Sequence, residues 1–154
     1  MITGFRHAGI SVADMEASLA FYRGVLGLAL VSDRVSPQGG RVAGVEAEIR
    51  ICVLDIPGSG PCVELVEYHG VEKKQMAGRA CDLGAGHASF RVHSADELYR
   101  LLRARGVEIA CEPILTAVGT KIFYAKDPDG FWLEFTEMPL LTAAEGSTVR
   151  TGKK

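Results

Sequence analysis

Hydrophobic and polar positions change their period several times along this chain, and the changes come in the same order in both halves. In the first half, alternation at residues 5–12 predicts a strand. After Asp14, "MEASLAFYRGVL" has apolar residues at helical spacing, which predicts a helix that ends near Gly27. Three further stretches are typical of strands, at residues 28–34, 48–55 and 62–68. The first half therefore predicts the order βαβββ.

The second half repeats this order. A strand is predicted at residues 87–92, and the capping box that begins at Ser94 and closes at Glu97 predicts the start of a helix that ends at Gly106. The sequence "DPDG" is typical of a tight turn. Strands are predicted on either side of it and after the helix, at residues 107–111, 121–126 and 131–136.

Two segments fall outside this pattern. Residues 70–86 are charged and then glycine-rich with no clear period, which predicts a linker. Residues 138–154 are polar and rich in small residues, which predicts a loose C-terminal tail. The predicted organisation is thus a first module at 1–69, a linker at 70–86, a second module at 87–137 and the tail.

Composition fits a small globular enzyme or binding protein. The chain has 154 residues, 47% of them hydrophobic, and a net charge of −2, with no basic run before Lys153 and Lys154. These values argue against nucleic acid as the main partner. The first residues lack the apolar core of a signal peptide, and no apolar run approaches the ~20 residues that span a membrane. Four cysteines without a C-x-x-C pair are expected to be reduced, so we expect a cytoplasmic protein that contacts no membrane.

Each half also carries one histidine and one glutamate in matching strings. His7 opens "HAGISV" and His87 opens "HASFRV", whereas Glu64 lies in "CVELVEY" and Glu134 in "FWLEFTE". A carboxylate among apolar residues in the middle of a strand is costly unless a charged group satisfies it. We therefore predict that the four side chains bind one divalent metal, and that water or substrate fills the remaining positions. Such a mixed nitrogen and oxygen site suits Zn, Ni, Co, Fe or Mn.

Four stretches resemble the vicinal oxygen chelate superfamily, the group of glyoxalase I, methylmalonyl-CoA epimerase, extradiol dioxygenases and antibiotic-resistance proteins. They are "HAGISVADMEASLAFYRGVLGL", "VELVEY", "GHASFRV" and "YAKDPDGFWLEF". The resemblance implies an α+β fold in which two βαβββ modules form a curved mixed sheet with a half-open cleft. It also implies a metal in that cleft at the four residues above, and a homodimer.

The metal set is closest to that of glyoxalase I, which has the order His, Glu, His, Glu. Extradiol dioxygenases carry a further histidine shortly before the tyrosine that Tyr124 resembles, and "ILTAVGTK" contains none. Epimerases usually have glutamine at the position of Glu64. Bacterial glyoxalase I holds the carboxylates of glutathione with an arginine and an asparagine where this chain has Ser11 and Tyr68. The resemblance therefore implies a metal-dependent lyase or isomerase that is not specific for glutathione.

The chemistry implied is proton transfer beside a metal-bound carbonyl of a small molecule, with Glu134 or Glu64 as the base. Tyr124, Tyr68 and Lys121 are the predicted substrate contacts. Three alternatives remain at this stage: a ring-cleaving or other dioxygenase, an isomerase like methylmalonyl-CoA epimerase, and a non-catalytic protein that binds an antibiotic. The sequence is compatible with a metal held within one chain or between two.

Overall fold

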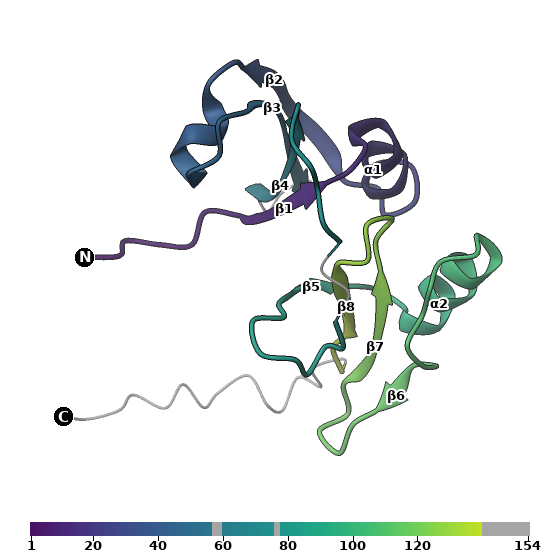
Figure 1. Ribbon diagram of the computed structural model, residues 1–154. Coiled ribbons are helices and arrows are strands. Elements are labelled where there is room, and N and C mark those ends of the chain that lie inside the picture. Colours follow the sequence, from purple (N-terminus) through teal and green to yellow (C-terminus); the bar gives the residue numbers. More distant parts are fainter. Residues whose placement is uncertain (57–59, 76–77, 140–154) are drawn as a thin grey trace.

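The computed structural model describes residues 1–56, 60–75 and 78–139, with the side chains at 60–62 left out (Figure 1). The elements of the first module are, in chain order, β1 (Ala8–Val12), α1 (Met15–Tyr22), β2 (Ala29–Ser36), the 3-10 helix η1 (Gly39–Ala43), β3 (Glu48–Ile56) and β4 (Gly60–His69). Those of the second are β5 (His87–Arg91), α2 (Ala95–Ala104), β6 (Ile114–Leu115), β7 (Lys121–Lys126) and β8 (Trp132–Glu137).

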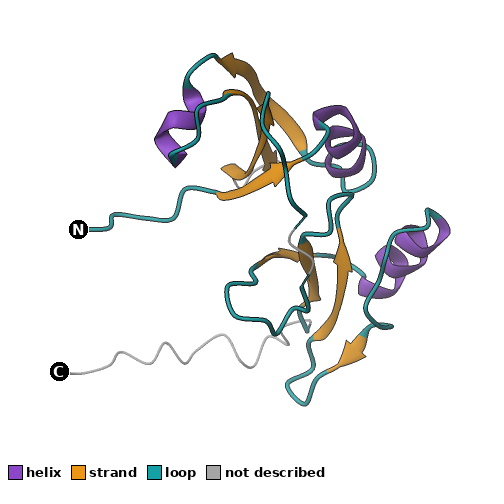
Figure 2. Ribbon diagram, in the orientation of Figure 1, coloured by secondary structure: helices purple, strands orange, loops and turns teal. Residues whose placement is uncertain are grey.

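Each module forms its own four-stranded mixed sheet (Figure 2). The strand orders are β1-β4-β3-β2 and β5-β8-β7-β6. In both sheets the first strand lies at an edge and pairs in parallel with the last strand, while the other pairings are antiparallel. The predicted α+β fold with two βαβββ modules is confirmed. The modules keep separate sheets among the described residues, whereas we had expected one curved sheet.

Capping residues start both helices where the sequence predicted. The Asp14 side chain accepts hydrogen bonds from the backbone of Glu16 at 2.8 Å and of Ala17 at 3.0 Å. The Ser94 hydroxyl accepts one from the backbone of Glu97 at 3.3 Å. Helix α1 ends earlier than predicted, at Tyr22, and the chain then turns through further backbone hydrogen bonds to glycine 27, whose φ is 78°.

One predicted strand is wrong. Residues 107–111 are no strand, and only Ile109 forms a bridge, to Ala125. The backbone lies beside β7 over a few residues, with Ala110 donating to the carbonyl of Tyr124 at 2.9 Å. Pro113 then has no N–H to continue a ladder, so pairing resumes only in the short strand β6.

Alternation along the strands gives each sheet two different faces. Ile10, Val12 and Leu65 are buried on the face toward α1, and Phe123 and Phe135 on the face toward α2. These residues belong to one hydrophobic cluster that includes both modules. The intervening residues of β4 and β8, among them the two glutamates, point to the opposite faces.

A buried polar contact joins the modules. The Tyr22 hydroxyl, at the end of α1, donates to Oδ2 of Asp127 at 2.9 Å, and Asp127 is only 5% exposed. Burial raises the pKa of Asp127 above its ordinary value, although hydrogen bonds from Phe131, Tyr22 and Asp129 oppose this. The backbone N–H of residue 13 also donates to Asp129 at 3.1 Å. The turn "DPDG" therefore fixes the second module against both ends of α1.

The described part of the linker contains no helix or strand, and it lies against this junction. Lys73 donates to the carbonyl of Ala13 and Gln75 to that of Asp129, both at 3.0 Å. The predicted loose tail at 138–154 falls almost wholly outside the described residues. Within the described ranges, no helix is long and apolar enough to cross a bilayer.

Candidate metal centre

The second module brings His87 and Glu134 to one face of its sheet. Because β5 and β8 are parallel, His87 lies opposite Trp132 and Ser89 lies opposite Glu134. Residues two apart on a strand point to the same face, so His87, Ser89 and Glu134 all lie on one face of this sheet. Its Nε2 is 3.9 Å from Oε2 of Glu134.

Three hydroxyl groups donate to the Glu134 carboxylate. The Ser89 and Thr136 hydroxyls reach Oε1 at 2.6 and 3.2 Å, and the Tyr124 hydroxyl reaches Oε2. Burial raises the pKa of Glu134, but these donors and His87 outweigh it and lower the pKa below its usual range. Burial and the neighbouring carboxylate raise the pKa of Tyr124 to about 12. Tyr124 is thus a protonated donor at neutral pH, and Glu134 is an ionised acceptor held in a fixed position.

The first module forms the corresponding pair with different surroundings. His7 lies just before β1, and its Nε2 is 3.4 Å from Oε1 of Glu64. Nη2 of Arg34 is 3.8 Å from Oε2 of the same carboxylate. In this module the positions of the three hydroxyl donors hold residues without hydroxyls, Gly9, Val53 and Val66. Within the described residues, no side chain makes a hydrogen bond to Glu64.

The first pair has the donor spacing of a metal site, and the second pair is close to it. Two donors that share one ion at about 2.0–2.2 Å lie roughly 3.0–3.5 Å apart. The His7–Glu64 distance of 3.4 Å is in this range, and the His87–Glu134 distance of 3.9 Å needs only a small adjustment. However, no cluster of three or more His, Cys, Asp or Glu side chains suited to a metal occurs among residues 1–56, 60–75 and 78–139. Each module therefore brings together one histidine and one glutamate, and neither pair has a third such side chain beside it in the described residues.

The predicted substrate contacts divide into two groups. Tyr124 lies beside Glu134, and the alternation of β4 puts Tyr68 on the same face as Glu64. Lys121 points away from both pairs: three positions from Tyr124 on β7, it faces α2 and donates to Asp96 at 2.6 Å. This hydrogen bond raises the pKa of Lys121.

Sequence reasoning missed Ser89, Thr136 and Arg34, which contact the glutamates, and Arg91, which lies on the sheet face of Glu134. The period of two from His87 and Glu134 was a usable signal for Ser89 and Thr136. Arg34 had no such signal, because a bulge between Leu30 and Ser32 shifts the register of β2 before it reaches this residue.

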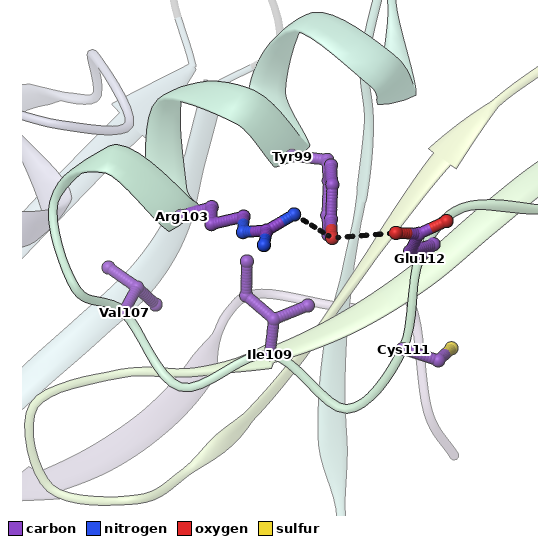
Figure 3. Close-up of a pocket in the computed structure, with 6 residues that line it drawn as sticks. All are labelled: Tyr99, Arg103, Val107, Ile109, Cys111 and Glu112. Carbon is purple, nitrogen blue, oxygen red and sulfur yellow. Dashed lines mark hydrogen bonds between the residues drawn. The ribbon is translucent and has the colours of Figure 1, made fainter.

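A hollow of about 340 Å³ lies on the α2 side of the second module, away from the face of Glu134 (Figure 3). Its lining residues are Tyr99, Arg103, Val107, Ile109, Cys111 and Glu112. Arg103 donates to the Tyr99 hydroxyl at 3.3 Å, and this hydroxyl is 3.4 Å from the Glu112 carboxylate to which it donates. The polar groups of the hollow thus bond to one another.

The sequence of the chain is similar to that of a known superfamily and of several lactoylglutathione lyases. Residues 4–135 match the sequence model of the Glyoxalase/Bleomycin resistance protein/Dioxygenase superfamily. The chain is 28% identical over 137 residues to lactoylglutathione lyase of Salmonella typhimurium, with 85% of this chain and 90% of that protein covered. It is 25% identical over 132 residues to a probable lactoylglutathione lyase of Synechocystis, with 85% and 92% covered. A probable chloroplastic lactoylglutathione lyase of Arabidopsis thaliana is longer, and the match, also 28% identical, covers 85% of this chain but only 35% of that one.

Solved structures give the same result for the fold. A glyoxalase family protein from Bacillus cereus superposes with a TM-score of 0.77 at 19% identity, covering 89% of this chain and 95% of that one. Glyoxalase I of Leishmania major superposes with a TM-score of 0.65 at 25% identity, covering 85% and 84%. Glyoxalase I of Zea mays gives 0.65 at 25% identity, with 84% of this chain but only 43% of that chain covered.

Proposed function

The chain belongs to the Glyoxalase/Bleomycin resistance protein/Dioxygenase superfamily, and from that premise we propose that it is a metal-dependent lyase or isomerase that moves a proton next to a carbonyl group of a small molecule. The observation that carries the proposal is the pair of His–Glu contacts, one in each module, at distances of 3.4 and 3.9 Å that are in or close to the donor spacing of a divalent metal site. A divalent ion there would act as a Lewis acid that stabilises negative charge developing on the substrate.

The two carboxylates are suited to different roles. Glu134 accepts hydrogen bonds from three hydroxyl groups, so moving it would break all three. Glu64 has no hydroxyl donor among the described residues and makes only the longer contacts to His7 and Arg34. In this proposal, Glu134 keeps a constant position and Glu64 moves to accept the proton.

A second copy of the chain completes the site in this proposal. The two pairs lie on separate sheets, and both histidines belong to a strand at a sheet edge or directly precede one. Edge strands are open to contact by another chain. In a two-fold dimer, the pair of one copy's first module would face the pair of the other copy's second module, and symmetry would form two such sites.

The proposed substrate is not restricted to glutathione conjugates. Ser11, which would lie near the substrate, has no charge, and β1 places it on the same face as Glu64. Tyr68 is likewise uncharged at neutral pH. The relatives above are named for lactoylglutathione, so thioesters of lactate are the reasonable first substrates to try.

Proton exchange separates the roles of the two glutamates. Metal-loaded protein is incubated in D2O with S-lactoylglutathione or S-lactoyl-N-acetylcysteamine, and NMR follows loss of the proton at C2 of the lactoyl group. We expect exchange with both thioesters. Glu64→Gln should slow exchange by roughly 10²–10⁴-fold with metal retained, whereas Glu134→Gln should lose metal. Exchange that survives loss of both carboxylates would contradict the proposal.

A further inference from the structure

Two arginines lie on the same sheet faces as the two His–Glu pairs. Arg34 on β2 is opposite Ile51 of β3, which in turn is opposite Val66 of β4, so Arg34 shares the face of Glu64. Arg91 is the last residue of β5 and follows Ser89 by one alternation step, so it shares the face of Glu134. Each His–Glu pair therefore has a guanidinium group on its own face.

Both guanidinium groups have unused hydrogen-bond donors. Arg34 makes one ion pair, to Glu64 at 3.8 Å, which is longer than a hydrogen bond, and its side chain is 50% exposed. Arg91 is exposed and has no hydrogen bond or ion pair within the described residues. A guanidinium carries five N–H donors in a planar fork that matches the two oxygens of an anionic group.

Two other cations on these sheets, in contrast to Arg34 and Arg91, have close contacts with carboxylates. Arg50 donates to Asp33 at 2.7 and 3.0 Å and to Glu16 at 2.7 Å. Lys126, on the same face as Tyr124, is 2.7 Å from Glu108 and lies over the ring of Trp132. Arg34 and Arg91 thus differ from these cations in that neither donates a hydrogen bond or makes a close ion pair among the described residues, the Arg34–Glu64 distance being 3.8 Å.

We propose that Arg34 and Arg91 bind an anionic group of the substrate, a carboxylate or a phosphate, separate from the oxygens that would contact the metal. This inference rests on the proposed function above. The charges of Glu64 and Glu134 would cancel that of a divalent ion, so the two arginines leave the assembled site with a net positive charge. Such a site favours an anionic small molecule over a neutral one of the same size.

Three chelating probes that differ only in a distal group test this inference. Propanohydroxamate provides the chelating oxygens alone, succinate monohydroxamate adds a carboxylate, and 3-phosphonopropanohydroxamate adds a phosphonate. Calorimetry measures the binding of each to protein loaded with Ni²⁺ or Zn²⁺. We expect at least one anionic probe to bind about tenfold tighter than propanohydroxamate or more, because a hydrogen bond to a charged group contributes this much. The order of the two anionic probes tells carboxylate from phosphate.

The variants are Arg34→Gln and Arg91→Gln, with Arg100→Gln as the matched control, because Arg100 is an exposed arginine on α2 without a partner among the described residues. Each of the first two should reduce the advantage of the anionic probe, with metal content unchanged, and the control should preserve it. Equal binding of all three probes to metal-loaded protein would overturn this inference alone, as would an equal loss in the control. A protein that takes up no divalent metal would overturn the proposed function and this inference together.

Discussion

The two His–Glu pairs occupy equivalent places in two modules of the same topology, yet their surroundings differ. In the second module three hydroxyl groups hold Glu134, whereas glycine and two valines occupy the matching positions around Glu64. The same sheet geometry thus supports one carboxylate rigidly and leaves the other with an ion pair to Arg34. In both modules strand pairing places the carboxylate beside a histidine, while the neighbours on adjacent strands determine how many hydrogen bonds hold it.

The largest expected effect comes from removing a donor to Glu134. Tyr124→Phe deletes the hydroxyl that donates to Oε2, so the carboxylate is no longer held in a position suited to the ion. We expect metal affinity to fall about 10–100-fold, the usual loss when a partner of a metal ligand is removed. Competition with a chromophoric chelator measures this.

Tyr99→Phe is the control for this change, since the Tyr99 hydroxyl contacts Glu112 and Arg103 on the opposite side of the sheet. Its metal affinity should equal that of the parent. An unchanged affinity in Tyr124→Phe would show that Glu134 needs no such support, and the contrast between the pairs would lose its meaning.

Adding a hydroxyl donor beside Glu64 in the first module would sharpen the comparison. Gly9 lies opposite Glu64 as Ser89 lies opposite Glu134, and a Cβ added to Gly9 meets nothing within 4 Å. Gly9→Ser should therefore give Glu64 a hydroxyl donor. Proton exchange into a lactoyl thioester should slow about tenfold, the effect of one hydrogen bond to the base, while metal is retained.

The control for this variant is Gly9→Ala, which adds the Cβ without the hydroxyl. Equal slowing in both variants would mean that bulk, and not a hydrogen bond, causes the effect. Faster exchange in Gly9→Ser would contradict the assignment of Glu64 as the proton acceptor.

The smallest effect on the two His–Glu pairs themselves is expected from a change at the junction that holds the modules together. Tyr22→Phe removes a donor to the buried Asp127 carboxylate, which should lower the free energy of unfolding by about 1–3 kcal/mol at pH 7. The pKa of Asp127 is already raised by burial, so the folded state binds its proton more tightly than the unfolded state does. Stability contributed by this group is therefore lost as pH rises from its ordinary pKa of 3.8 through the raised one.

The Tyr22 hydroxyl lowers the pKa of Asp127, so its loss should raise that pKa further. The destabilisation by Tyr22→Phe should then be largest at neutral pH and shrink below about pH 4, where Asp127 is protonated. Urea unfolding of parent and variant at pH 7 and below about pH 4 measures this loss of stability. If the difference in free energy of unfolding between variant and parent stayed constant with pH, the hydrogen bond would not act through the Asp127 charge.

The sequence predicted the parts of this molecule that depend on local pattern. Period and capping residues located both helices and nearly all strands, and the matching strings around the two histidines identified the pairs. The misses depended on which residue lies opposite which. The hydroxyl of Ser89 reaches Glu134 across two paired strands, and a bulge decides the face of Arg34.

Lys121 and Tyr124 were both predicted as substrate contacts, although the period of a strand argues against it. On an alternating strand, residues three positions apart point to opposite faces. Pro113 explains why pairing does not continue directly after 107–111, but not why only Ile109 of that stretch forms a bridge.

The most direct test of the central proposal is to mix two inactive variants. His7→Ala with Glu64→Ala removes the first-module pair, and His87→Ala with Glu134→Ala removes the second. If each metal is held by opposite modules of two copies, either variant alone binds no metal at the site. After unfolding and refolding of an equal mixture, about a quarter of the parent's metal should return, because half of the dimers are mixed and each has one intact site of two. Metal that never returns on mixing, although the refolded mixture is dimeric and the parent binds metal, would contradict the account and place the site within one chain.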